Sequence, residues 1–206
     1  MHPRLRLTLM TIASLAIVAA ATVILTSSPR QATSARGEFT GAISPVAPPV
    51  SFSLRDEDGR GVDAATLRGQ PVLVTFLYTS CQNDCPTIAA QVRAALDDTP
   101  IAVHALAISV DPARDSPAAR RRFVSRHHLT GRMRFLSGSD AELQRVWRAF
   151  GIQPQVSGRE HSARVVLLDG AGRQRVAFPI DQLTPEGLAH DLRLLATARP
   201  GSANAG

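Results

Sequence analysis

Two uninterrupted apolar runs constrain the fold of this chain more than any other feature. They read PVLVTFLY, at residues 71–78, and IAVHALAISV, at residues 101–110. A strand with one face in water alternates apolar and polar side chains, whereas a continuous apolar run is typical of a strand buried in a parallel sheet. The stretch that joins the two runs, CPTIAAQVRAAL, has helical spacing. We therefore predict an α/β domain in which both runs are buried strands.

The rest of the globular part continues this alternation of strands and helices. VSFSL is predicted as a short strand before the first run, and MRFLSG as another after the second. DSPAARRRFVSRHHL is predicted as a helix with Asp115 or Ser116 as its N-cap, and SDAELQRVWRAFG as a helix with a capping-box start and a stop at Gly151. SARVVLLDGAGRQRVAF is typical of a hairpin, and TPEGLAHDLRLLAT of a closing helix. This order predicts a thioredoxin-like α/β sandwich with an extra N-terminal strand.

The N-terminus is organised differently. Residues 7–25 form an uncharged run of 19 residues rich in Leu, Ile, Val and Ala. Because about 17 to 25 apolar residues cross a bilayer, residues 1–26 are predicted to be one transmembrane anchor. Arg4 and Arg6 should stay in the cytoplasm, which sends the C-terminal domain to the periplasmic or extracellular side of the cell membrane. A signal peptide cleaved at the small residues ATSA, 32–35, is the alternative.

Composition and charge set the remaining boundaries. Residues 27–50 are rich in Ser, Ala and Pro and are expected to be a flexible tether, and residues 199–206 a disordered tail. The domain itself is assigned to residues 51–198. The formal net charge is +6, but residues 1–36 carry four arginines and no acid, which leaves +2 for the rest. That excess is too small for a nucleic-acid-binding domain, so no nucleic-acid partner is expected.

The chemistry is concentrated on the only two cysteines, Cys81 and Cys85, in TFLYTSCQNDCPTIAA. Cys81 follows the first buried strand and Cys85 opens the next helix, at the sheet edge where open α/β proteins bind ligands. Residues four apart lie on one side of a helix, and the positive helix N-terminus is expected to lower the thiol pKa values. The residues alone leave three uses open: a disulfide, a nucleophile or a metal site.

Three blocks, FLYTSCQNDCP, ISVDPARDSP and HSARVVLLDGAGR, resemble the signature blocks of the Sco/SenC family, and the resemblance spans about residues 52–194. It implies a membrane-anchored, thioredoxin-fold copper protein needed to assemble cytochrome c oxidase. By position it implies that Cys81, Cys85 and His161 bind one copper ion, with Glu160 where the family commonly has Asp. It also places the loop of Asp111 near the copper. The implied partners are cytochrome c oxidase subunit II, other copper chaperones and thioredoxin-like reductants.

The donor chemistry agrees with copper. Two thiolates and one imidazole form a soft, three-coordinate set that suits Cu(I) and can also hold Cu(II). Structural zinc takes four protein ligands, and Asp84 or a water is the only fourth ligand that the sequence offers. The predicted site is therefore copper on Cys81, Cys85 and His161, with Asp84, Asp111 and Glu160 in support.

Three functions remain after the resemblance. The first is a copper metallochaperone, not an enzyme, that delivers copper to the binuclear copper site of cytochrome c oxidase subunit II. The second is a thiol-disulfide oxidoreductase in which Cys81 or Cys85 attacks and reduces the cysteines of the same acceptor. The third is a redox or copper sensor. His161 separates them, because a tight copper site needs it and a dithiol reductase does not.

Other conspicuous residues are expected to be structural. The DPARD loop is expected to cap the helix that follows it. Trp147 and Phe150, one helical step apart, are expected in the core. The triplet RRR, at residues 120–122, is expected on a solvated helix face.

Overall fold

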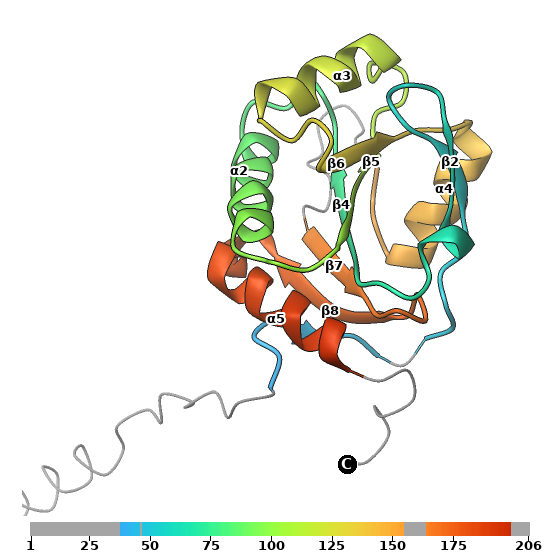
Figure 1. Ribbon diagram of the computed structural model, residues 1–206. Helices are drawn as coiled ribbons and strands as arrows, with labels where there is room; N and C mark the ends of the chain where they lie inside the picture. The colour runs from blue at the N-terminus through green and yellow to red at the C-terminus, as the bar shows by residue number, and fades with distance from the viewer. Residues whose placement is uncertain (1–37, 46, 155–163, 199–206) are drawn as a thin grey trace, which may run out of the picture. The chain divides into compact units, whose positions relative to one another are not determined.

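The computed structural model describes residues 38–45, 47–154 and 164–198 (Figure 1). Six strands form one sheet, and their order across the sheet is β1, β8, β7, β4, β5, β6. From edge to edge they are β1 Ala42–Ile43, β8 Gln174–Pro179, β7 Arg164–Leu168, β4 Val72–Leu77, β5 His104–Ser109 and β6 Met133–Leu136. β4, β5 and β6 are parallel, while β7 is antiparallel to both β4 and β8. The two predicted apolar runs are confirmed as the central strands β4 and β5.

Helices cover both faces of this sheet. They are α2 Asp84–Asp97, α3 Pro117–Arg126, α4 Asp140–Phe150 and α5 Pro185–Thr197. Figure 1 shows α2 and α5 side by side along one face, with α4 on the other. Side chains of β4 alternate between two cores: Leu73 and Leu77 pack with α2 and α5, whereas Val74 and Phe76 pack with α4. The order β8, β7, β4, β5 between these helices is that of the predicted thioredoxin-like α/β sandwich.

The capping signals in the sequence are confirmed. Ser116, not Asp115, is the N-cap of α3, and its hydroxyl accepts a backbone N–H of the first turn. In α4, Ser139 and Glu142 form the capping box, and Gly151 takes a left-handed φ of 61° at the C-cap. Because the hydroxyl of Ser116 caps α3, the carboxylate of Asp115 is used elsewhere.

A two-stranded ribbon precedes the main sheet. β2 Ser53–Arg55 pairs with β3 Gly61–Asp63, and the 3-10 helix η1 Ala64–Leu67 follows. The predicted N-terminal strand therefore exists, but it belongs to the ribbon and not to the six-stranded sheet. Phe52 and Leu54 are buried in the core beside α4, so apolar packing attaches the ribbon. A second 3-10 helix, η2 Ile180–Gln182, precedes α5.

The compact unit begins at Phe39 rather than at residue 51. β1 pairs with β8, and the carboxylate of Asp191 in α5 accepts the backbone N–H groups of Thr40 and Gly41 at 2.9 and 3.0 Å. The last part of the segment that composition assigned to a flexible tether is therefore packed on the domain. Its local sequence did not predict this because the groups that hold it lie far away in the chain.

Within the part of the chain that the structure describes, no helix is long and apolar enough to cross a bilayer. The anchor expected at residues 1–26, the first part of the expected tether and the expected tail at residues 199–206 lie outside that part. Those three assignments stay predictions.

Arg120 contradicts the expectation of a solvated helix face at residues 120–122. Only 4% of its surface is exposed, and its guanidinium donates to the backbone carbonyls of Phe135 at 2.6 Å and Arg55 at 3.1 Å. These bonds attach α3 to β6 and to the ribbon, which is why the charge can be buried. Trp147 and Phe150 are buried, as predicted.

Candidate functional site

The two cysteines lie together at the carboxyl end of β4, as predicted. Cys81 is in the loop after β4, and Cys85 lies in the first turn of α2, whose N-cap is Asn83. The backbone N–H of Cys85 donates to the sulfur of Cys81, with 3.3 Å between nitrogen and sulfur. Cys85 is fully buried, Cys81 is partly exposed, and both are free thiols. One partly exposed sulfur and one buried cysteine are thus brought together, although Cys81 precedes the N-cap and lies outside α2.

Burial controls the acidity of Cys85. Loss of solvation raises the pKa of its thiol well above the ordinary value, and the hydrogen bond with the Cys81 side chain and the charge of Asp84 add to the rise. The expectation that the helix N-terminus lowers this pKa is wrong for Cys85, because desolvation outweighs the helix dipole. A bound metal ion would reverse this balance, since a coordinating thiol is deprotonated.

Tyr78 contacts the thiols and was missed by the sequence analysis. Its backbone carbonyl accepts the N–H of Cys81 at 3.3 Å, which closes a turn between the two residues. Burial, followed by the side-chain hydrogen bond with Cys81, raises the pKa of Tyr78 to about 12. The phenol therefore keeps its proton at neutral pH. The aromatic residue in FLYTSC was visible, but the sequence gives no sign that its hydroxyl contacts the sulfur.

Asp115 is a second residue whose role the sequence analysis missed. It is 2% exposed, and its carboxylate accepts the N–H and the hydroxyl of Thr79 at 2.7 Å each and the hydroxyl of Ser109 at 2.6 Å. The loop after β5 is thereby bonded to the loop that carries Cys81. One signal was available: Asp115 and Ser116 both precede Pro117, and only one of them can cap the helix.

Asp111, which was predicted to support the site, lies in the same loop after β5 as Asp115, but its carboxylate binds Arg114 rather than the loop of the cysteines. Its carboxylate accepts a hydrogen bond from the Nε of Arg114 at 2.5 Å, and its own N–H donates to the hydroxyl of Ser109 at 3.2 Å. The carboxylate therefore fixes an exposed arginine, while the backbone joins the network around Asp115.

The remaining predicted site residues, Glu160 and His161, lie outside the described residues. β7 begins at Arg164 and runs antiparallel to β4, so its first residues are at the sheet edge where β4 ends and the cysteines lie. Among the residues that the structure does describe, no group of three or more His, Cys, Asp or Glu side chains is placed to hold a metal ion. The cysteine pair is the part of the predicted ligand set that the structure brings together.

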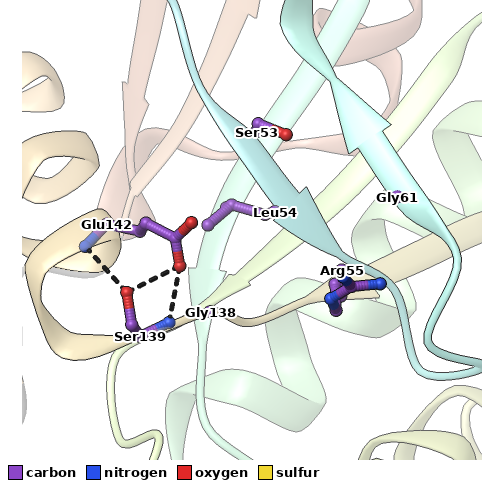
Figure 2. Close-up of a pocket in the computed structure, with 7 residues that line it drawn as sticks. All are labelled: Ser53, Leu54, Arg55, Gly61, Gly138, Ser139 and Glu142. Atoms are coloured by element: carbon purple, nitrogen blue, oxygen red, sulfur yellow. Dashed lines mark hydrogen bonds between the residues drawn. The ribbon is translucent and has the colours of Figure 1, made fainter.

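A surface hollow of about 290 Å³ lies between the β2–β3 ribbon and the start of α4 (Figure 2). Its lining residues are Ser53, Leu54, Arg55, Gly61, Gly138, Ser139 and Glu142. The hydroxyl of Ser139 donates to the carboxylate of Glu142 at 2.6 Å (Figure 2), so these polar groups are already used by the helix cap. Neither cysteine lines the hollow, and we place the functional site at the thiols.

The fold and the thiols define a class: a thioredoxin-fold protein with a dithiol at the junction of a central strand and the next helix. Within that class, the chain belongs to the SCO1/SenC family, whose family model matches residues 45–197. The matched region contains Cys81 and Cys85, and it also contains His161.

Comparisons with individual proteins agree. The SCO1 protein homolog of Bacillus subtilis is 30% identical over 98 residues, and the chain spans only about half of that relative, with 45% of this chain and 51% of the relative covered. The structure of Bradyrhizobium japonicum ScoI with copper bound is 32% identical, with a TM-score of 0.61 over 71% of this chain and 98% of that one. Apo Sco1 of Thermus thermophilus is 26% identical, with a TM-score of 0.66 over 78% and 99%. These matches confirm the thioredoxin-like fold, and one of the relatives holds copper.

Proposed function

We propose that this protein is a membrane-anchored copper chaperone. On this proposal it binds one copper ion through Cys81, Cys85 and His161 and delivers it to the binuclear copper site of cytochrome c oxidase subunit II. The observation that carries the proposal is the pair of free thiols at the start of α2, joined by an N–H to sulfur hydrogen bond, in a chain of the SCO1/SenC family. The copper in the Bradyrhizobium relative supports copper as the metal.

The donor set fits copper as the cargo. Thiolates are soft ligands that select Cu(I), and imidazole also suits copper. Cys81, Cys85 and His161 supply three donors, one fewer than structural zinc takes. Because burial raises the pKa of Cys85, copper uptake at neutral pH releases the proton of that thiol. The exposed side of Cys81 gives an acceptor thiol access for ligand exchange.

The anchor and the tether give the proposed function its location. Residues 1–26 hold the protein in the cell membrane, and the domain faces the extracytoplasmic side. Tethering raises the effective concentration for a weak encounter with a membrane-bound oxidase. Because oxidising conditions there favour disulfides, a thioredoxin-like reductant is the further partner that keeps both cysteines as thiols. Another copper chaperone is the expected source of the metal.

The test is an anaerobic copper(I) titration of the reduced full-length protein in detergent, read as stoichiometry and affinity. We expect one tight site per chain, lost in Cys85→Ser and greatly weakened in His161→Ala. His104→Gln is the matched control. His104 is the first residue of β5, at the end of the parallel strands opposite to the cysteines, and its substitution should not affect copper binding. Weak binding that is indifferent to His161 would overturn the proposal.

The unequal exposure of the two thiols favours one alternative, a thiol-disulfide oxidoreductase. Cys81 attacks a disulfide of the acceptor and forms a mixed disulfide, and the thiolate of Cys85 then attacks Cys81 and releases the acceptor with two electrons gained. The raised pKa of Cys85 disfavours this second attack, which is why we place the chaperone first. Cys85→Ser separates the two functions: a reductase accumulates the mixed disulfide on Cys81, and a chaperone does not.

A further inference from the structure

Among the contacts of the cysteine loop, residues 78–85, two bear on the position of Cys81. One is the bond from the N–H of Cys85 to the sulfur of Cys81. The other is Thr79, whose N–H and hydroxyl donate to the same oxygen of Asp115, each at 2.7 Å. The first contact is within the loop, whereas the second ties the loop to a residue 36 positions away.

The contact between Thr79 and Asp115 controls where the contact between Cys85 and Cys81 forms. The N–H of Cys81 donates to the carbonyl of Tyr78, so the chain makes a tight turn between these two residues, and Thr79 is the second residue of that turn. Fixing both the backbone and the side chain of Thr79 fixes the turn. The turn in turn sets where the sulfur of Cys81 lies relative to the N–H groups at the start of α2.

Asp115 is itself rigidly placed. The second oxygen of its carboxylate accepts the hydroxyl of Ser109, the last residue of β5, at 2.6 Å. Its backbone carbonyl accepts the Nε of Arg120 at 3.2 Å, and Arg120 also donates to the carbonyl of Phe135 in β6. Two strands and α3 therefore fix the group that holds Thr79.

Helix capping does not explain this buried acid, because Ser116 caps α3. A carboxylate with 2% of its surface exposed loses most of its hydration. Burial raises the pKa of the Asp115 carboxyl in spite of the hydrogen bonds from Ser109 and Thr79, so the ionised form is held at a cost. The buried carboxylate of Asp115 contacts the cysteine loop through Thr79, and we assign its role to that contact.

We infer that Asp115 is a positioning residue for the two thiols: through Thr79 it holds the turn that sets Cys81 against the start of α2. The inference rests on the proposed function for its copper readout, whereas the geometry can be tested without metal. It predicts that a substitution of Asp115 changes the hydrogen-exchange rate of the Cys85 amide, although that amide donates to Cys81 and not to Asp115.

The first test measures amide hydrogen exchange in the reduced, copper-free, full-length protein in detergent. In Asp115→Ala the amide of Cys85 should exchange about tenfold faster, the factor expected when a contact worth one hydrogen bond is lost. Asp115→Asn should remain near the wild type, because its side-chain oxygen still accepts both bonds from Thr79. Thr79→Val loses only the hydroxyl bond and should fall between the two.

Copper(I) affinity is the second readout. We expect Asp115→Ala to bind copper about tenfold more weakly or worse, as is found for residues that orient metal ligands, and Asp115→Asn to restore the affinity. If the wild type itself binds no copper tightly, the proposed function fails while the exchange rates still decide the role of Asp115.

Asp191→Ala is the matched control, because Asp191 is also a buried carboxylate that accepts backbone N–H groups. It should speed exchange at Thr40 and Gly41 and leave Cys85 unchanged. The inference is overturned if Asp115→Ala speeds exchange at Thr79 alone, or if Asp191→Ala alters Cys85 equally. If Asp115→Ala does not fold, Thr79→Val decides: wild-type exchange at Cys85 in that variant overturns the inference.

Discussion

Two buried carboxylates fasten distant parts of this chain, Asp115 beside the cysteines and Asp191 beside the outermost strand of the sheet. Asp115 accepts one N–H and two hydroxyls, from Thr79 and Ser109. A hydroxyl donor exists only where the side chain is Ser, Thr or Tyr. The contact at Asp115 therefore depends on which residues stand at positions 79 and 109.

Asp191 works through the backbone instead. Its two oxygens accept the N–H groups of Thr40 and Gly41, and its other partner is the ring Nδ1 of the neighbouring His190 at 2.9 Å. Every residue except proline has a backbone N–H. Asp191 thus selects a path for the N-terminal segment, whereas Asp115 selects particular side chains. The difference predicts that Asp191 mainly supports the stability of the fold, whereas Asp115 mainly supports the geometry of the cysteine site.

The largest effect on stability is expected at Asp191. Asp191→Ala leaves the N–H groups of Thr40 and Gly41 without their acceptor and should lower the free energy of unfolding by about 3 kcal/mol. Denaturant titration of the full-length protein measures this. The copper affinity of the folded variant should equal that of the wild type. A loss of copper affinity in this variant would show that Asp191 and Asp115 do not act independently.

The path selected by Asp191 should also reject a larger residue at Gly41. A Cβ there would lie 2.5 Å from a methyl carbon of Val176 and 2.8 Å from the ring of Phe178, both of which are buried. Gly41→Ala should therefore lower the free energy of unfolding by about 2 kcal/mol. Gly61→Ala is the control, because a Cβ at Gly61 meets nothing within 4 Å, and it should change stability by less than about 0.5 kcal/mol.

A matched pair of threonines compares the two regions directly. The hydroxyl of Thr79 donates to the carboxylate of Asp115 at 2.7 Å, whereas that of Thr40 donates to the carbonyl of Gly187 at 3.1 Å. Thr79→Val should cost about 1.5 kcal/mol and Thr40→Val about 0.5 kcal/mol, because bonds to charged groups are stronger. Equal losses in denaturant titrations would contradict the dependence of Asp115 on side-chain identity.

The smallest effect is a difference in pH dependence. Because burial raises the pKa of Asp115 in the folded state, the folded protein holds this proton more tightly than the unfolded chain does. The resulting stabilisation is present below the unfolded-state pKa and is lost as pH rises through the folded-state pKa. Asp115→Asn removes it, so the stability of the wild type relative to this variant should fall as pH rises from acid to neutral. Denaturant titrations of both proteins across that pH range measure the difference between their free energies of unfolding. A difference that does not change with pH would contradict this titration of Asp115.

The elements that could be predicted are those with local signals. The continuous apolar run of β4 and the capping box at Ser139 are visible in a few neighbouring letters, and both are confirmed. The approach of Cys81 and Cys85 was also predictable, because Cys81 follows the strand end and Cys85 lies at the start of the next helix. In each case the information lies in residues that are close together in the sequence.

The features that could not be predicted depend on distant partners. β1 lies in a Pro-rich and Ser-rich stretch with no strand pattern, and β8 and Asp191 hold it from the other end of the chain. Arg120 looked solvated because the carbonyls that bind it belong to other elements. The raised pKa of Cys85 required knowledge of its burial, since the helix position alone suggested the opposite direction.

β1 contains only two residues, yet its position affects how molecules of this protein meet one another. It pairs with β8 through Ala42 and Ile43, and the uncovered edge of a sheet is a template for strands of other chains. The strand that covers this edge is held by the carboxylate of Asp191, and its own Ile43 has 70% of its surface exposed. A molecule that loses these hydrogen bonds releases β1 together with Ile43, and it bares the part of β8 that Ala42 and Ile43 cover. We therefore expect the loss of Asp191 to favour edge-to-edge pairing between molecules.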